Sequence, residues 1–314
     1  MSYRFETGER VDDAARRIAD EQIQGALATL DDLDHLGIVE SVHDVRKRCK
    51  KLRGLARLVR PSLGGGFSRL NVHFRDLSRG LSAIRDAHAV LETFDHLVEA
   101  NRHHAPGGFP SVRAELERRS EEVSASLSAG DERLDVARRQ LRAGRLIAGS
   151  WDLGDDLDAI AAGVGATYAR SRRALKRSAT SPDDDALHDW RKRVKYLWYE
   201  VRLLEMAAPS VLTPMGDGLK ALSDALGDDH DLAVLSAWLH AGGEGFATAS
   251  ERSELDLVLA HQRADLLRRS RRLGARLLAE DTQAFTARFG SYLATWRAVG
   301  DELPCGKITS LPSS

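Results

Sequence analysis

The chain carries one stretch twice, first as Val42-His43-Asp44-Val45-Arg46-Lys47-Arg48-Cys49-Lys50 and again as Leu187-His188-Asp189-Trp190-Arg191-Lys192-Arg193-Val194-Lys195. The His, Asp, Arg, Lys, Arg and Lys are identical in the two copies, at an offset of 145 residues. The same offset pairs a second set, Leu77, Ser78, Leu81 and Asp86 with Leu222, Ser223, Leu226 and Asp231. Two separate segments that agree on one offset predict an internal duplication. We expect the first half to cover residues 1–150 and the second 151–303.

Apolar residues recur at helical spacing on both sides of the repeated stretch, and no run alternates with the period of a strand. In the first half we expect helices over about residues 11–30, 40–60, 67–100 and 111–148. In the second half we expect them over about 157–178, 184–208, 215–240 and 250–299, the last with breaks. Pro209 and Pro214 should bracket a connection, because proline interrupts helices. The predicted fold is all-α, two helical bundles, followed by a disordered tail over 304–314.

Both copies of the stretch separate charge from apolar residues around the helix. At about 100° per residue, the first helix gathers cations within about 80° of His43, and its opposite side is apolar. The expected contact residues for an anion on the first helix are His43, Arg46, Lys47, Lys50, Arg53 and Arg57. Those on the second helix are His188, Arg191, Lys192, Lys195, Tyr199 and Arg202.

A solvated helix face usually mixes charges of both signs, and the first stripe does not. Between Val42 and Arg60 the chain holds eight Lys or Arg and a single acid, Asp44. Like charges at this spacing weaken a helix, so their retention favours an anionic partner. Further basic stripes are candidates for the same surface: Arg75, Arg79, Arg138, Arg142, Arg145, Arg268, Arg271 and Arg272.

Four acids that recur at the offset have structural interpretations. We expect Asp44 and Asp189 to lie near helix N-termini, where a carboxylate interacts favourably with the helix dipole. Asp86 and Asp231 could hold an arginine across the bundle.

Composition narrows the class of protein. The 314 residues have a net charge of -1, so an anion site must come from local segregation of charge. Cys49 and Cys305 lack partners at metal-ligand spacing and are expected to be free thiols in a reducing compartment. No metal site or cofactor is expected. No signal peptide or stretch of membrane-spanning length is visible, so we expect a cytoplasmic protein without membrane association.

The repeated His-x-x-Arg-Lys segment, with Ile84-Arg85-Asp86 and Gly227-Asp228-Asp229-His230-Asp231-Leu232, resembles the CHAD family, the conserved histidine α-helical domain. The resemblance covers about residues 10 to 300. It implies two helical bundles related by a pseudo-two-fold axis, with basic residues of both around a shared central surface. It also implies binding of inorganic polyphosphate, with localisation on polyphosphate granules. The chain departs from the family pattern where Trp198 matches Arg53, and where His88 and Ala233 replace the usual second Asp.

The resemblance favours a stand-alone binding module that is not an enzyme. Some family members carry a triphosphate-hydrolysing tunnel domain with a Glu-x-Glu-x-Lys signature, and residues 3–9 do not supply it. One alternative is a phosphotransfer protein in which His43 accepts a phosphoryl group. A second is nucleic-acid binding, which the net charge and the 6% aromatic content disfavour. A third, chelation of a divalent metal, would depend on the four acids alone.

Overall fold

A computed structural model describes residues 3–103, 107–241 and 247–300. The expected tail over 304–314 and Cys305 therefore lie outside the described residues. The described part of the chain is all-helical, as predicted, and contains no strand.

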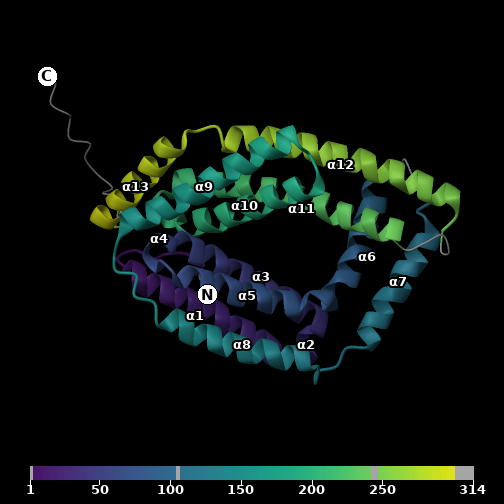
Figure 1. The fold of residues 1–314 in the computed structure, drawn as a ribbon, viewed down its shortest axis with the longest axis horizontal. Helices are drawn as coiled ribbons and strands as arrows, with labels where there is room; N and C mark the ends of the chain where they lie inside the picture. The colour runs from purple at the N-terminus through teal and green to yellow at the C-terminus, as the bar shows by residue number, and fades with distance from the viewer. Residues whose placement is uncertain (1–2, 104–106, 242–246, 301–314) are drawn as a thin grey trace.

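Residues of the first half form eight helices, shown in purple to teal in Figure 1. They are α1 (Val11–Asp31), α2 (Leu33–Leu36), α3 (Ile38–Leu58), α4 (Arg60–Leu63), α5 (Gly66–Gly80), α6 (Ser82–Ala100), α7 (Pro110–Ala125) and α8 (Glu132–Gly149). The helix expected over 67–100 is thus divided at Leu81, directly after Gly80. Glycine adds flexibility to a helix and favours such a division.

The second half contributes the remaining helices. They are α9 (Leu157–Thr180), α10 (Asp184–Leu203), the 3-10 turn η1 (Glu205–Ala207), α11 (Pro209–Ala241), α12 (Ala249–Leu277) and α13 (Thr282–Val299). The expectation that Pro209 and Pro214 bracket a connection was wrong, because α11 begins at Pro209 and continues through Pro214. Pro209 occupies the first helical position, where a missing N–H costs nothing, and Pro214 removes only one bond near the start.

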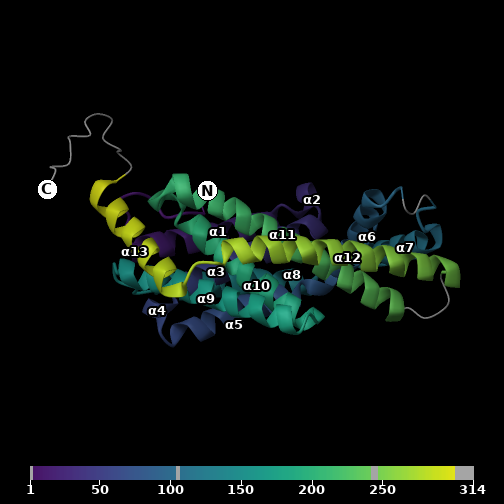
Figure 2. The same ribbon diagram turned by 90° about the horizontal axis from the view of Figure 1, so that it is seen from above.

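The helices form two layers that meet at α3 and α10 (Figure 1). Helices α1, α3, α5 and α8 make one layer, and α9 to α13 make the other. Helix α12 runs along much of the elongated molecule (Figure 2). The order of helices after Leu157 parallels that after Val11, as a duplication would produce; the duplication itself stays a prediction.

Two hydrophobic clusters hold the layers together, and each draws on both halves of the chain. The larger one includes Leu52 and Leu55 of α3 together with Trp190 and Leu197 of α10. The smaller one joins α6 and α7 to α11 and α12, for example through Phe94 and Leu235. The boundary at residue 150 therefore separates helices in sequence but does not separate two cores.

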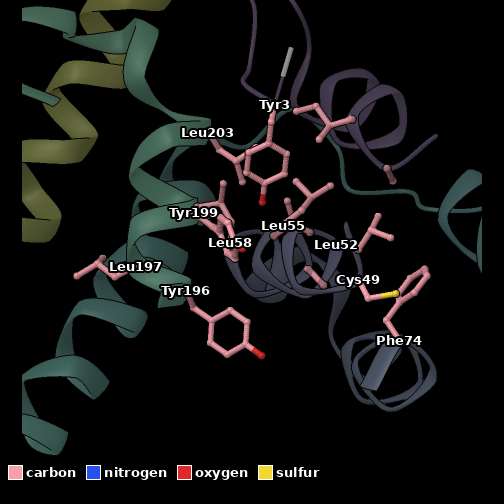
Figure 3. Packing of buried hydrophobic residues seen from close by; sticks show 14 of the residues in the cluster. Tyr3, Cys49, Leu52, Leu55, Leu58, Phe74, Tyr196, Leu197, Tyr199 and Leu203 are labelled. Atoms are coloured by element: carbon pink, nitrogen blue, oxygen red, sulfur yellow. The ribbon is translucent and has the colours of Figure 1, made fainter. Parts of the chain in front are cut away.

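A glycine allows α3 and α10 to approach closely. A Cβ atom on Gly54 would lie 3.0 Å from Cβ of Tyr199 and 3.2 Å from the hydroxyl of Tyr3. At the 145-residue offset Gly54 corresponds to Tyr199, so equivalent positions of the two helices meet at this crossing. Figure 3 shows Tyr3 beside Tyr199, Leu55 and Leu203 at the same place.

Candidate functional site

A cavity of about 790 Å³ lies between α3, α6, α10 and α11, next to the crossing of α3 and α10. Eight Lys or Arg side chains line it, against two carboxylates, Asp86 and Asp231. The eight are Arg46, Lys47, Lys50, Lys51, Arg85, Arg191, Lys195 and Arg202. A cavity with this excess of cations attracts a ligand with several negative charges.

The structure brings eight of the twelve expected contact residues together around this cavity. They are His43, Arg46, Lys47, Lys50, Arg191, Lys195, Tyr199 and Arg202. His188 does not line the cavity. Its ring lies 4.5 Å from the ring of His230, and His230 does line the cavity. Tyr199 is 2% exposed and serves as packed support for the wall.

The other predicted residues lie elsewhere. Lys192 does not line the cavity and pairs with Asp189 at 3.5 Å. Arg53 and Arg57 lie on the far side of the crossing, where both cover the ring of Tyr196. None of the arginines of the further basic stripes lines the cavity, and most of them have partners elsewhere. These arginines are Arg75, Arg79, Arg138, Arg142, Arg145, Arg268, Arg271 and Arg272. Arg75 pairs with Asp76, Arg138 with Asp135 and Arg145 with Asp20.

The dipole interpretation of Asp44 and Asp189 was wrong, because both lie beyond the first turn of helices that begin at Ile38 and Asp184. Asp44 instead forms ion pairs with Lys47 at 2.9 Å and with Arg48 at 2.5 Å, three and four residues further along the helix. Asp189 bonds Lys192 and Arg193 in the same way. Each acid fixes two basic side chains of its own helix.

Asp86 and Asp231 face cations in the cavity without a close ion pair. Among the described residues, neither carboxylate has a basic nitrogen within 4 Å. The charge of Asp86 nevertheless acts on Arg46, and burial raises the pKa of Asp231 although the charges of Arg191, Lys50 and Arg85 act in the opposite direction. The two acids are therefore weak counterions for the eight cations.

Burial and the crowding of like charges shift the pKa values of three basic side chains that line the cavity. Burial and the charges of Arg191, Arg46 and Lys195 together lower the pKa of Lys50 to about 8. Burial and Arg202 likewise lower the pKa of Lys51 to about 8. Burial and the charge of Arg85 lower the pKa of His43 to about 4, so this imidazole is neutral at neutral pH. In all three groups burial and neighbouring positive charges disfavour the charged form, as expected where cations are crowded with few anions.

Aromatic rings support three of these cations. The ring of Tyr199 lies 5.9 Å from that of Tyr3 and 4.9 Å from that of Trp198. Lys51 Nζ lies 5.0 Å from the centre of Tyr3, and Lys195 Nζ lies 4.4 Å from that of Trp198. Arg202 stacks over Trp198 at 5.4 Å. Ring faces attract cations, so this aromatic row keeps charged groups in place while no anion is present.

Two buried nitrogens beside the cavity have unused hydrogen-bonding capacity. Within the described part of the chain, Nη1 of Arg46 has no hydrogen-bond partner, and neither has Nδ1 of His188. Leaving a buried donor without a partner is costly. An anionic oxygen in the cavity would satisfy the guanidinium of Arg46.

A sequence model of the CHAD domain family matches residues 17–240, which include both copies of the basic stretch. This chain belongs to the CHAD domain family. It is also similar in fold to the crystal structure of the CHAD domain from the plant Ricinus communis, at 16% sequence identity and a TM-score of 0.58. The similarity covers 92% of this chain and 94% of the plant chain. A comparison with curated proteins found no match.

The cavity residues of this CHAD domain that were not predicted as contacts include Lys51, Arg85, Trp198 and His230. Lys51 was predictable, because it lies about 80° from His43 on the helical wheel, on the side opposite Arg53. Arg85 and His230 correspond to one another at the 145-residue offset and belong to the motif that carried the resemblance. Their place in the wall depends on α6 and α11 packing against the basic helices.

Among the described residues no group of three or more His, Cys, Asp or Glu is placed to hold a metal ion. None of the described helices combines the length and the apolar character needed to cross a membrane.

Proposed function

We propose that this CHAD domain binds inorganic polyphosphate in the cavity between α3, α6, α10 and α11, as a binding module without catalytic activity. The observation that carries the proposal is the excess of eight Lys or Arg over two carboxylates in one cavity. Family membership supports it as well. Arginine offers a fork of donors and lysine a point charge, which together suit the repeated oxygens of a phosphate chain.

The function is tested by titrating the protein with long polyphosphate, tripolyphosphate, orthophosphate and RNA at several salt concentrations. With about six cation–phosphate contacts, affinity for the long chain should fall by about two to three orders of magnitude between about 50 and about 200 mM salt. Long chains should bind far better than tripolyphosphate, because neighbouring phosphates rebind at high effective concentration. A salt-independent affinity, or equal affinity for both lengths, would contradict the proposal.

Binding of long polyphosphate is expected to weaken as the pH rises from about 7 to about 10. The pKa of both Lys50 and Lys51 is about 8 in the free protein, and a bound anion would raise it. Above pH 8 the protein must therefore take up protons to bind, so affinity falls by up to about tenfold per pH unit for each lysine. Affinities measured at constant ionic strength follow this change.

The control for the pH series is Lys50→Arg/Lys51→Arg, in which both positions keep their charge well above pH 10. Its affinity should be nearly constant over the same range. A decline as steep as that of the wild-type protein would exclude the two lysines as its cause.

Two of the three alternatives from the sequence can be distinguished from polyphosphate binding by experiment. A phosphotransfer protein would acquire acid-labile phosphate on His43 or His188 during incubation with a phosphodonor. A nucleic-acid-binding protein would release polyphosphate on addition of equal charge equivalents of RNA. Polyphosphate binding predicts neither.

A further inference from the structure

A second group of cations lies across the α3–α10 crossing from the cavity. It comprises Arg53, Arg57, Arg60, Arg170, Arg173 and Arg193, which we call the outer arginine cluster. Arg57 lies 3.8 Å from the ring centre of Tyr196, and Arg60 lies 4.7 Å from that of Phe67. The charges of Arg60 and Arg193 act on Arg170, and that of Arg193 also acts on Arg57. Helices α3, α4, α9 and α10 thus place these side chains side by side.

The outer arginine cluster has little compensating negative charge. In the described parts of the chain, only Arg193 among the six has a carboxylate within 4 Å, Asp189. Glu200 lies beneath the cluster but is fully buried, and burial raises its pKa well above the usual value. One of its oxygens accepts from Thr167 at 2.9 Å and the other has no partner among the described residues. The charge of Glu200 acts on Arg57 and Arg170, but burial disfavours its ionised form, so it is a weak counterion for the arginines above it.

The cluster and the cavity are built from equivalent positions. At the 145-residue offset, Tyr196, Arg53 and Arg57 correspond to Lys51, Trp198 and Arg202 of the cavity wall. Each edge of the crossing therefore carries two cations and one aromatic ring that supports a cation. The ring of one edge corresponds to a cation of the other, because Tyr196 matches Lys51 and Trp198 matches Arg53.

The same helices connect the two edges. On α3, Arg57 follows Lys50 of the cavity by two helical turns, about 10 Å. On α10, Tyr196 directly follows Lys195, which lines the cavity. A flexible chain of phosphates that fills the cavity can therefore continue over the crossing and meet further guanidinium groups.

We infer that the outer arginine cluster is a second anchoring site for the same polyanion, occupied by the part of a long phosphate chain that extends beyond the cavity. This inference rests on the proposed function and adds a determinant of chain-length preference. A nucleic acid is less suited to the cluster, because Tyr196 is 7% exposed and is already covered by Arg57, which leaves no free face for a base.

The test removes three guanidinium groups of the cluster as Arg60→Gln/Arg170→Gln/Arg173→Gln. The matched control, Arg268→Gln/Arg271→Gln/Arg272→Gln, removes the same charge from α12, where none of the three lines the cavity. The probes are long-chain sodium polyphosphate and tripolyphosphate, which is short enough for the cavity alone. Affinity and its salt dependence are measured for both variants and the wild-type protein.

We expect the cluster variant to bind tripolyphosphate like the wild-type protein and long polyphosphate about tenfold more weakly. Its salt dependence on the long chain should decrease by about two counterions, at about 0.7 for each lost contact. Equal affinity of the cluster and control variants for the long chain would overturn the inference, as would an equal loss for both probes. Absence of saturable binding by the wild-type protein would instead refute the proposed function.

A second variant keeps the test decisive if the first is poorly folded. Arg60→Glu/Arg173→Glu changes only two exposed side chains, so its helicity should equal that of the wild-type protein. Charge reversal should weaken long-chain binding at least as much as the three neutral substitutions. An unchanged long-chain affinity in this folded variant would overturn the inference.

Discussion

Replacing Arg46, Lys50, Arg191 and Lys195 together by Gln is expected to lower the affinity for long polyphosphate by about a thousandfold or more. All four line the cavity, two from each basic helix. A hydrogen bond to a charged group contributes about 1.5–3 kcal/mol, so four such contacts contribute about 6–12 kcal/mol, which exceeds a factor of a thousand. Titration at fixed low salt measures the loss.

Two further variants separate the contributions of α3 and α10 to the affinity for long polyphosphate. Arg46→Gln/Lys47→Gln/Lys50→Gln removes three cavity cations, whereas Arg191→Gln/Lys192→Gln/Lys195→Gln removes only two, because Lys192 pairs with Asp189 outside the cavity. The α3 variant should therefore bind more weakly than the α10 variant. Equal losses would indicate that the path of the ligand is not the cavity described above.

Folding should survive these substitutions, and the thermal midpoint should rise without ligand. The like charges that lower the pKa of Lys50 are removed, and with them a repulsion in the free protein. Circular dichroism would show whether helicity is retained. Loss of helicity would mean that the stripe is structural, and full retention of polyphosphate binding would exclude the repeated motif as the site.

Gly163→Ala is expected to destabilise the protein by about 3 kcal/mol, with a fall in the thermal midpoint on the order of 6 °C. Helix α9 crosses α3 at this residue, and a Cβ atom there would lie 1.9 Å from the carbonyl oxygen of Leu58. The obstacle is the backbone of a buried residue, so relief requires the two helices to move apart. Thermal unfolding followed at 222 nm (about the α-helical minimum) measures the change.

The control is Gly80→Ala, near the end of α5, where no heavy atom lies within 4 Å of the added methyl group. Alanine favours the helix by about 1 kcal/mol over glycine, so this variant should be as stable as the wild-type protein or slightly more stable. A midpoint for Gly163→Ala equal to that of the control would show that α9 and α3 are not packed at this distance.

Local periodicity was sufficient to predict the fold class. Each turn of a helix places residues three and four apart on one side, so the cationic stripe opposite Cys49 and Leu52 is visible in the sequence. The structure shows that these apolar residues are buried and that Arg46, Lys47 and Lys50 face a cavity, whereas Arg48 lies outside it and pairs with Asp44. Helix ends were less predictable, because the continuation of α11 through Pro214 depends on packing as well as on propensity.

Membership of the cavity wall was decided by tertiary structure. Arg53 and Arg57 continue the stripe of α3, yet they lie beyond the point where Gly54 meets Tyr199, so the crossing assigns them to the opposite edge. Arg85 and His230 enter the wall because α6 and α11 pack against the basic helices. A helical wheel describes one helix alone, whereas a cavity depends on where several helices cross. The sequence alone therefore determined which faces are charged, and the packing of the two layers decided which of those charges meet.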